Sequence, residues 1–213
     1  SCLALALLFG IGGASCFNLA LGRGEKDKAI HFVGNALVML TICGTSLCLI
    51  TQVFLTPLLV AFGAPDDVLP YAQAYVRITA FGFPFLLLTT GGGHLMRADG
   101  SPRMTMFCNL SGAIINTVLD AIFVLGFEWG MEGAALATVI GQVFSGVLVI
   151  RYMCHFKTAP LQKKHFKVQM QYTGQIMSIG MASFFNQLAI MLVQIVLNNS
   201  LKYYGSLSVY GES

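Results

Sequence analysis

Charged side chains are scarce in this sequence: Asp, Glu, Lys and Arg make up 10% of its 213 residues, whereas 56% of the residues are hydrophobic. Ordinary soluble domains carry charge on roughly a quarter of their residues. This chain therefore has too few charged side chains to cover a water-exposed surface. The net charge of +3 is small, which gives no indication of a nucleic-acid partner. Lipid is the remaining solvent, and we expect a bilayer around the chain.

The sequence also lacks the patterns of common enzymes and metal sites. It contains no HExxH motif, no CxxC pair and no Ser/His/Asp or Cys/His arrangement, and the Gly91–Gly93 run lacks the Lys-Ser/Thr of a P-loop. Its six cysteines fall mostly in apolar stretches, where we expect small thiols that pack between helices. We therefore predict neither a catalytic residue nor a cofactor. We expect the four histidines to be loop side chains in or near the basic turns, without metal-ligand spacing: His31, His94, His155 and His165.

Long apolar runs make up most of the chain. A helix that crosses a bilayer needs about 20 largely apolar residues, and in lipid every backbone polar group must be paired within the chain, which leaves helices where no strand alternation is present. The predicted fold class is an all-α, polytopic transmembrane bundle. Six spans are predicted, over residues 1–21, 29–61, 70–95, 104–126, 133–150 and 171–201.

Two of these spans should not be straight. The run 29–61 would be ~50 Å long as one helix, well over the ~30 Å hydrocarbon core, and Pro57 is the expected place for a break. Gly82 and Pro84 predict a kink in the third span. The chain opens at Ser1 inside an apolar run and stops just after another, so we expect a fragment of a longer protein.

The basic residues are sorted by turn. Turns 22–28, 96–103 and 151–170 hold ten of the twelve Lys and Arg residues. Turns 62–69 and 127–132 hold no Lys or Arg, and their charged residues are all Asp or Glu. By the positive-inside rule the basic turns face the cytoplasm. A wrong span count would have scrambled this alternation, so the charges independently support six spans. We expect a multi-pass protein of a bacterial cell membrane.

One acid, Asp120, lies deep in a predicted span. A carboxylate in hydrocarbon costs ~2.5–3.5 kcal/mol or more, so such residues usually face a cavity and mark an ion pathway. Asn116 and Asn109 fall on the same helical face as Asp120. Their oxygens suit a small hard cation or a proton. The alternative is a structural hydrogen bond between spans, with Asp120 permanently protonated.

Further polar side chains at similar spacing could line the same interior. Thr138 and Gln142 are four residues apart on the fifth span. The sixth span repeats the spacing of the Asn109 stripe without a charge, and amide hydrogen bonds between helices would explain that repeat equally well. We expect the glycines of the first and fifth spans to serve close helix packing. The residues of the repeat are Gln187, Gln194 and Asn198.

Four segments of the sequence resemble the multidrug and toxic compound extrusion (MATE) family. The stretch NTVLDAIFVLGFEWGMEGAALATVIGQ, residues 116–142, is the most specific, and the others are ASCFNLALGRGEKDKA at 14–29, MRADGSPRMTM at 96–106 and IVLNNSLKYYG at 195–205. Members of that family have twelve helices in two six-helix lobes. The resemblance covers almost the whole chain and implies helices two to seven: amino-lobe helices at 1–152, a cytoplasmic linker at 153–170 and the start of the carboxyl lobe at 171–213.

The resemblance also implies a function. Family members exchange organic cations for Na⁺ or H⁺ by alternating access, and in several prokaryotic members the amino-lobe cation site matches Asn116, Asp120 and Thr138 here. The expected partners are the bilayer and small organic cations, with the full-length protein working as a monomer and the coupling ion in place of a cofactor. The stretch GMASFFNQ at 180–187 lacks an acid that some relatives carry, so the coupling ion is open. A lipid-linked-sugar flippase of the wider superfamily and an integral-membrane enzyme are the alternatives.

Overall fold

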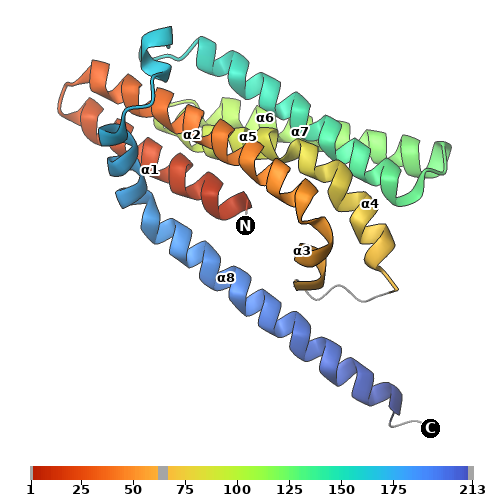
Figure 1. Ribbon diagram of the computed structural model, residues 1–213. Helices are drawn as coiled ribbons and strands as arrows, with labels where there is room; N and C mark the ends of the chain where they lie inside the picture. Colours follow the sequence, from red (N-terminus) through yellow and green to blue (C-terminus); the bar gives the residue numbers. More distant parts are fainter. Residues whose placement is uncertain (1, 62–66, 211–213) are drawn as a thin grey trace.

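The computed structural model describes residues 2–61 and 67–210, and the side chains of residues 2–61 and 67–201 (Figure 1). Six helical units in this part of the chain are long and apolar enough to cross a membrane, which confirms the predicted span count. The helices are α1 (Cys2–Gly22), α2 (Lys26–Val53), α3 (Leu55–Ala61), α4 (Leu69–Thr79), α5 (Phe83–Ala98), α6 (Pro102–Asp120), α7 (Gly130–Cys154) and α8 (Met170–Tyr210). Two 3-10 turns, Ala80–Gly82 and Lys163–Phe166, and a π-helical turn, Ala121–Gly126, complete the elements.

Both predicted irregularities are present, one of them shifted. The second span breaks at Phe54, three residues before Pro57, so the prediction of a break at Pro57 itself was wrong in position. The shift has a steric cause, because a proline ring collides with the carbonyl four residues earlier, here that of Val53. Pro84 lies in the first turn of α5, directly after the 3-10 turn Ala80–Gly82, which confirms the kink.

The polar turns are shorter than predicted. The α2 helix begins at Lys26, α5 runs to Ala98 and α7 runs to Cys154, so charged residues assigned to turns occupy the terminal turns of helices instead. Helices can extend beyond the hydrocarbon because backbone hydrogen bonding continues into the aqueous interface. Residues 62–66 of the predicted turn 62–69 lie outside the described part of the chain.

Small residues allow the helices to pack closely, as predicted. A Cβ atom on Gly12 of α1 would lie 2.2 Å from the backbone oxygen of Ile176, and one on Gly180 of α8 would lie 2.0 Å from that of Leu8. At the α6–α7 crossing, a Cβ on Gly112 would overlap the Ser145 hydroxyl at 1.8 Å. These approaches position α7 against α6 and α8 against α1.

The α1 helix lies inside the bundle, where it packs against α2, α5 and the amino-terminal half of α8. The α6 and α7 helices form an antiparallel pair on the other side of α5. The carboxyl-terminal half of α8 extends away from the other helices (Figure 1), and its apolar side chains such as Val193 and Leu197 are exposed. The site candidates Asn116 and Thr138 therefore lie at the packed α6–α7 crossing, whereas Gln194 and Asn198 lie on the part of α8 that extends beyond the bundle.

Candidate functional site

The structure brings Asn116 of α6 and Thr138 of α7 together. The Asn116 Nδ2 atom donates a hydrogen bond to Thr138 Oγ1 over 3.2 Å, and Thr138 Oγ1 in turn donates to the backbone oxygen of Ala134 over 2.9 Å. The contact depends on the close crossing at Gly112 and Gly141, where any larger side chain would separate the two helices. Two residues 22 positions apart are thus held in one polar pair inside the bundle.

This pair lies in the wall of a cavity between α5, α6 and α7. The cavity has a volume of about 210 Å³, room for several water molecules at ~30 Å³ each. Its other polar walls are Thr89, Gln142 and Ser145. The buried oxygens Thr89 Oγ1 and Gln142 Oε1 have no hydrogen-bond partner among the described residues. Buried oxygens without partners are rare in proteins and favour a polar or cationic occupant.

Asp120 lies one helical turn beyond Asn116, at the last residue of α6. The next six residues form a π-helical turn, a feature frequently found at functional sites. The Asp120 side chain is half-buried, and its Oδ1 atom is buried without a hydrogen-bond partner among the described residues. A carboxylate, an amide and a hydroxyl on one stretch of α6 and α7 are the oxygen ligands that a hard cation prefers.

The remaining predicted residues have different places. Gln142 lines the cavity described above. Asn109 is exposed and lines a shallow surface pocket with Arg97, Pro102 and Met106. Gln187 is half-exposed, and Gln194 and Asn198 are exposed on the half of α8 that leaves the bundle. The described helices do not bring the α8 amides near Asn116, so a shared cavity stays a prediction for those residues.

Sequence reasoning missed Thr89, which supplies one of the unpartnered oxygens. It is one of two adjacent threonines in the mainly apolar helix α5, and it has no polar companion at helical spacing that could have signalled its orientation. The pattern on α6 and α7 was informative because polar residues recurred there every four or seven positions. Thr89 joins the site through the α5–α7 packing alone.

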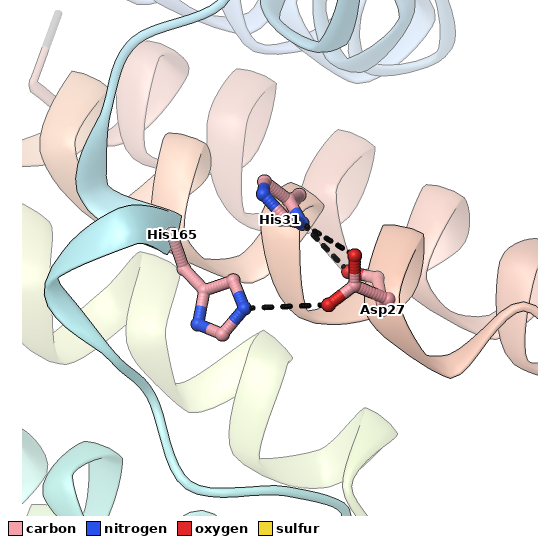
Figure 2. A group of neighbouring side chains, drawn as sticks. All are labelled: Asp27, His31 and His165. Carbon is pink, nitrogen blue, oxygen red and sulfur yellow. Dashed lines mark hydrogen bonds and ion pairs between the residues drawn. The ribbon is translucent and has the colours of Figure 1, made fainter.

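A second polar cluster joins α2 to the segment between α7 and α8, residues 155–169, which is called the linker below. Asp27 and His31 of α2 meet His165 of the linker, and one candidate ligand atom from each lies within 4.8 Å of the others (Figure 2). The expectation of loop histidines was wrong for His31, which lies in α2, and for His94, which lies in α5. His31 and His165 are far apart in sequence, so no ligand spacing could have revealed the contact.

The hydrogen bonds of this cluster place protons where a metal ion would need lone pairs. His31 Nδ1 lies 2.8 Å from the backbone oxygen of Asp27, so it must be the donor. His165 Nδ1 accepts a hydrogen bond from the Gln162 backbone N–H over 3.0 Å, so the proton of the neutral ring lies on Nε2. The Nε2 atom faces Asp27 Oδ1 at 3.6 Å. Both nitrogens facing Asp27 thus carry protons, and the cluster fits hydrogen bonding better than metal binding.

Burial lowers the pKa of His165 below its usual value, and the nearby His31 lowers it further. The Gln162 N–H acts in the same direction, because it hydrogen-bonds to a nitrogen that only the neutral ring leaves unprotonated. His165 therefore favours its neutral form in the folded protein. The site on α6 and α7 remains the stronger candidate for ion binding.

The chain has clear relatives among known proteins. The MatE family model matches residues 2–122. The multidrug export protein MepA of Staphylococcus haemolyticus is 28% identical over 99% of this chain, and MepA of Staphylococcus aureus (strain NCTC 8325) is 27% identical over 98%. In both cases the match covers 47% of the relative, so the chain spans about half the length of the curated relatives it matches.

Solved structures show the same fold. A multidrug resistance MATE family transporter in an inward-facing conformation superposes with a TM-score of 0.84 at 23% identity, over 92% of this chain and 45% of that one. An outward-facing structure of such a transporter also gives 0.84, at 22% identity over 93% of this chain and 44% of that one. The sequence match over more than half of the residues and these superpositions lead to one conclusion: the chain belongs to the multidrug and toxic compound extrusion family and is a multi-pass membrane protein with the fold of about half such a transporter.

Proposed function

We propose that this chain forms most of the amino lobe, and the first helix of the carboxyl lobe, of an antiporter that exports organic cations in exchange for Na⁺ or H⁺. Family membership supports multidrug export as the general activity. The relatives are export proteins rather than enzymes, and the sequence offers no catalytic constellation. The equal fit to inward-facing and outward-facing transporters supports a lobe that keeps its fold while the access side changes.

The observation that carries the ion-coupling proposal is the polar pair Asn116–Thr138, with the unpartnered Asp120 Oδ1 one helical turn further along α6. In this proposal Asp120, Asn116 and Thr138 form the coupling site, with Gln142 and Thr89 as neighbouring oxygens. A bound Na⁺ would take oxygens from all three residues, while a proton would need only the Asp120 carboxylate. The donor set fits both ions, because every group offers a hard oxygen.

Ion binding at this place would act on the helices around it. Asp120 lies at the junction between the α-helical and π-helical parts of its span, where backbone hydrogen bonding changes partner. A charge change there would alter the packing of α6 against α7, and the organic cation would be released as a result. Equal charges exchanged one for one gain nothing from membrane voltage, so the ion's concentration gradient would drive the export.

The test is export of ethidium by cells that lack their own exporters and produce the longest natural polypeptide containing this chain. We expect Asp120→Asn to lower the export rate about tenfold or more, because contacts to a charged ligand are each worth about 1.5–3 kcal/mol. Thr138→Ala should weaken the dependence of export on Na⁺ or on pH, and Thr138→Ser should restore it by returning the hydroxyl.

Asn109→Ala is the matched control, since Asn109 lies on the same helix and is exposed. It should leave the export rate and its ion dependence unchanged. Normal export with normal ion dependence in the Asp120→Asn variant would refute the coupling role of this site. Loss of export in both Asp120→Asn and Asn109→Ala, with normal protein levels, would show that α6 does not act through this carboxylate.

A further inference from the structure

An apolar groove runs over the outer surface of α2, α5 and α7 and ends at the linker. Its volume is about 420 Å³, and it is lined by four residues each of α2 and α7, by Leu88 of α5 and by two linker residues. The rims are accessible: Ile42 of α2 is 48% exposed, Ile150 of α7 is 43% exposed and Phe166 of the linker is 41% exposed. The groove thus opens to the surroundings along a membrane-spanning pair of helices.

The lining leaves nothing for a polar ligand to bind. Thr41 is the one hydroxyl among the lining residues, and its Oγ1 already donates to the backbone oxygen of Leu37 over 2.9 Å. The other lining side chains are aliphatic, aromatic or sulfur-containing. An occupant of the groove itself must therefore be hydrocarbon, and in a bilayer the available hydrocarbon is an acyl chain.

The end of the groove at the linker has the opposite character. Phe166 lies in the same 3-10 turn as Lys163 and directly precedes Lys167, while Ile150 directly precedes Arg151. Residues 151–170 include five Lys and Arg residues and no Asp or Glu. A positive surface therefore adjoins the groove where the headgroup of a lipid in the groove would lie.

The nearby acids are already engaged elsewhere. Asp27 lies 3.8 Å from Lys164, and the buried Asp99 carboxylate accepts hydrogen bonds from Tyr152, Lys157 and Thr158. Among the described residues, Lys163, Lys167 and Arg151 make no ion pair with a carboxylate. Their charges are therefore available to an anionic group from outside the chain.

We propose that this groove is a binding site for one anionic phospholipid, with an acyl chain between α2 and α7 and the headgroup beside Lys163, Lys167 and Arg151. Neutral phospholipids share the acyl chain but lack the net negative charge, so the linker selects against them. The bound lipid would tie the linker to the membrane-spanning helices. This site is separate from the cavity at Asn116 and does not depend on its role.

The test measures lipid binding by quenching of tryptophan fluorescence. The protein has one tryptophan, Trp129, so a Trp129→Phe background allows a single reporter at the groove, Ile42→Trp, or at the opposite rim, Ile150→Trp. The matched control reporter is Ile114→Trp on α6, which is 55% exposed and does not line the groove. Each protein is placed in bilayers that contain brominated phosphatidylglycerol or brominated phosphatidylcholine in equal fractions.

We expect both groove reporters to show a preference for phosphatidylglycerol of about fivefold or more, since one basic residue near an anionic lipid contributes about that factor. The control reporter should show a ratio near one. Lys163→Gln and Lys167→Gln combined with Arg151→Gln should bring the groove ratio close to one, whereas Lys163→Arg combined with Lys167→Arg should preserve the preference. Removal of one positive charge from another basic turn, by Arg103→Gln, should have no effect.

Three results would overturn the proposal. Equal quenching by both lipids at the groove would mean ordinary lipid solvation of an apolar surface. Absence of quenching by either lipid would mean that another protein or a second copy of this chain covers the groove. A preference that survives loss of all three basic residues, in a protein with an unchanged thermal midpoint, would place the headgroup elsewhere.

Discussion

At the scale of single residues, Asp99 shows how one buried carboxylate fixes a distant segment. It lies in the short turn between α5 and α6 and is 8% exposed. Its Oδ2 accepts the Tyr152 hydroxyl at 2.7 Å and the Lys157 N–H at 2.8 Å, and its Oδ1 accepts the Thr158 N–H at 3.1 Å and the Thr158 hydroxyl. Every acceptor position is used, so the start of the linker is held against the α5–α6 turn.

We expect Asp99→Ala to free this end of the linker and lower the free energy of unfolding by roughly 2–4 kcal/mol, because hydrogen bonds to a charged group are worth about 1.5–3 kcal/mol each and are not additive. Asp99→Asn should cost less, since one of its two side-chain positions still accepts. Hydrogen exchange of the amides of residues 157 and 158, with the thermal midpoint in detergent, measures both effects.

The control is Asp67→Asn, which removes the charge of an exposed acid at the other end of the bundle. It should change neither the exchange rates nor the thermal midpoint. If Asp99→Ala leaves the two linker amides as protected as before, the carboxylate is not what holds them.

At the scale of elements, the linker is a docked segment. Its 3-10 turn rests on α2, where a Cβ on Gly34 would lie 2.1 Å from the His165 backbone oxygen. The buried Asn35 accepts the Gln169 backbone N–H over 2.9 Å and donates to the His31 backbone oxygen. Asp99 binds one end of the linker and Asn35 binds the other, so α8 starts from a fixed position.

This docking should weaken in acid because of His165. Its pKa is lowered in the folded state, so the unfolded or undocked state binds the proton more tightly, and stability present above about pH 6.5 is lost as the pH falls below that value. The groups that face His165 are Asp27 and His31 from α2 and Lys164 from its own turn; Asp27 opposes the effect and the other two promote it.

We therefore expect the amides of residues 162–169 to lose hydrogen-exchange protection at pH 5.5 relative to pH 7.5, after correction for intrinsic exchange rates. His165→Asn places an uncharged acceptor where Nδ1 lies and should make the protection independent of pH. The same acid-induced loss in His165→Asn would assign the effect to Asp27 or to another group.

Much of the element level could be predicted from sequence, because the length and apolarity of a span are set by the bilayer and not by its neighbours. The break near Pro57 and the kink at Pro84 followed from local sterics. The break lies three residues before Pro57, next to the Val53 carbonyl with which the proline ring would collide. Contacts such as His31 with His165, or Thr89 with the cavity, could not be predicted. They depend on how helices distant in sequence cross, and no local pattern records that.

The same distinction applies to the candidate site. The four-residue spacing of Asn116 and Asp120 on one helix was sufficient to place them on one face. The pairing with Thr138 rested on family resemblance, and the structure gives it a hydrogen bond. The stripe Gln187, Gln194 and Asn198 has equally regular spacing. Among the described residues, however, no other helix packs against the half of α8 that carries Gln194 and Asn198. Periodicity identifies a polar face without identifying what faces it.

At the scale of the whole molecule, the three basic turns lie at one end of the bundle. The linker contacts Asp99 of the α5–α6 turn through Lys157 and Thr158, and His165 faces Asp27 at the start of α2. The sequence predicted this grouping from charge alone, because six spans in alternation require it. The contacts between these turns are independent of the charge count, and they place the same three turns at one end of the bundle.

The positive-inside rule predicts that this end of the bundle faces the cytoplasm. In a variant whose six native cysteines are replaced by serine, we expect a membrane-impermeant maleimide to label Asp67→Cys and Glu132→Cys in intact cells. Lys163→Cys should react only after permeabilisation. Asp67 lies in the turn before α4 and Glu132 in the first turn of α7, and both are exposed, so they serve as matched reporters for the opposite face. Labelling of Lys163→Cys in intact cells would invert the orientation, while opposite results for Asp67→Cys and Glu132→Cys would contradict the six-span count, since an even number of crossings must separate them.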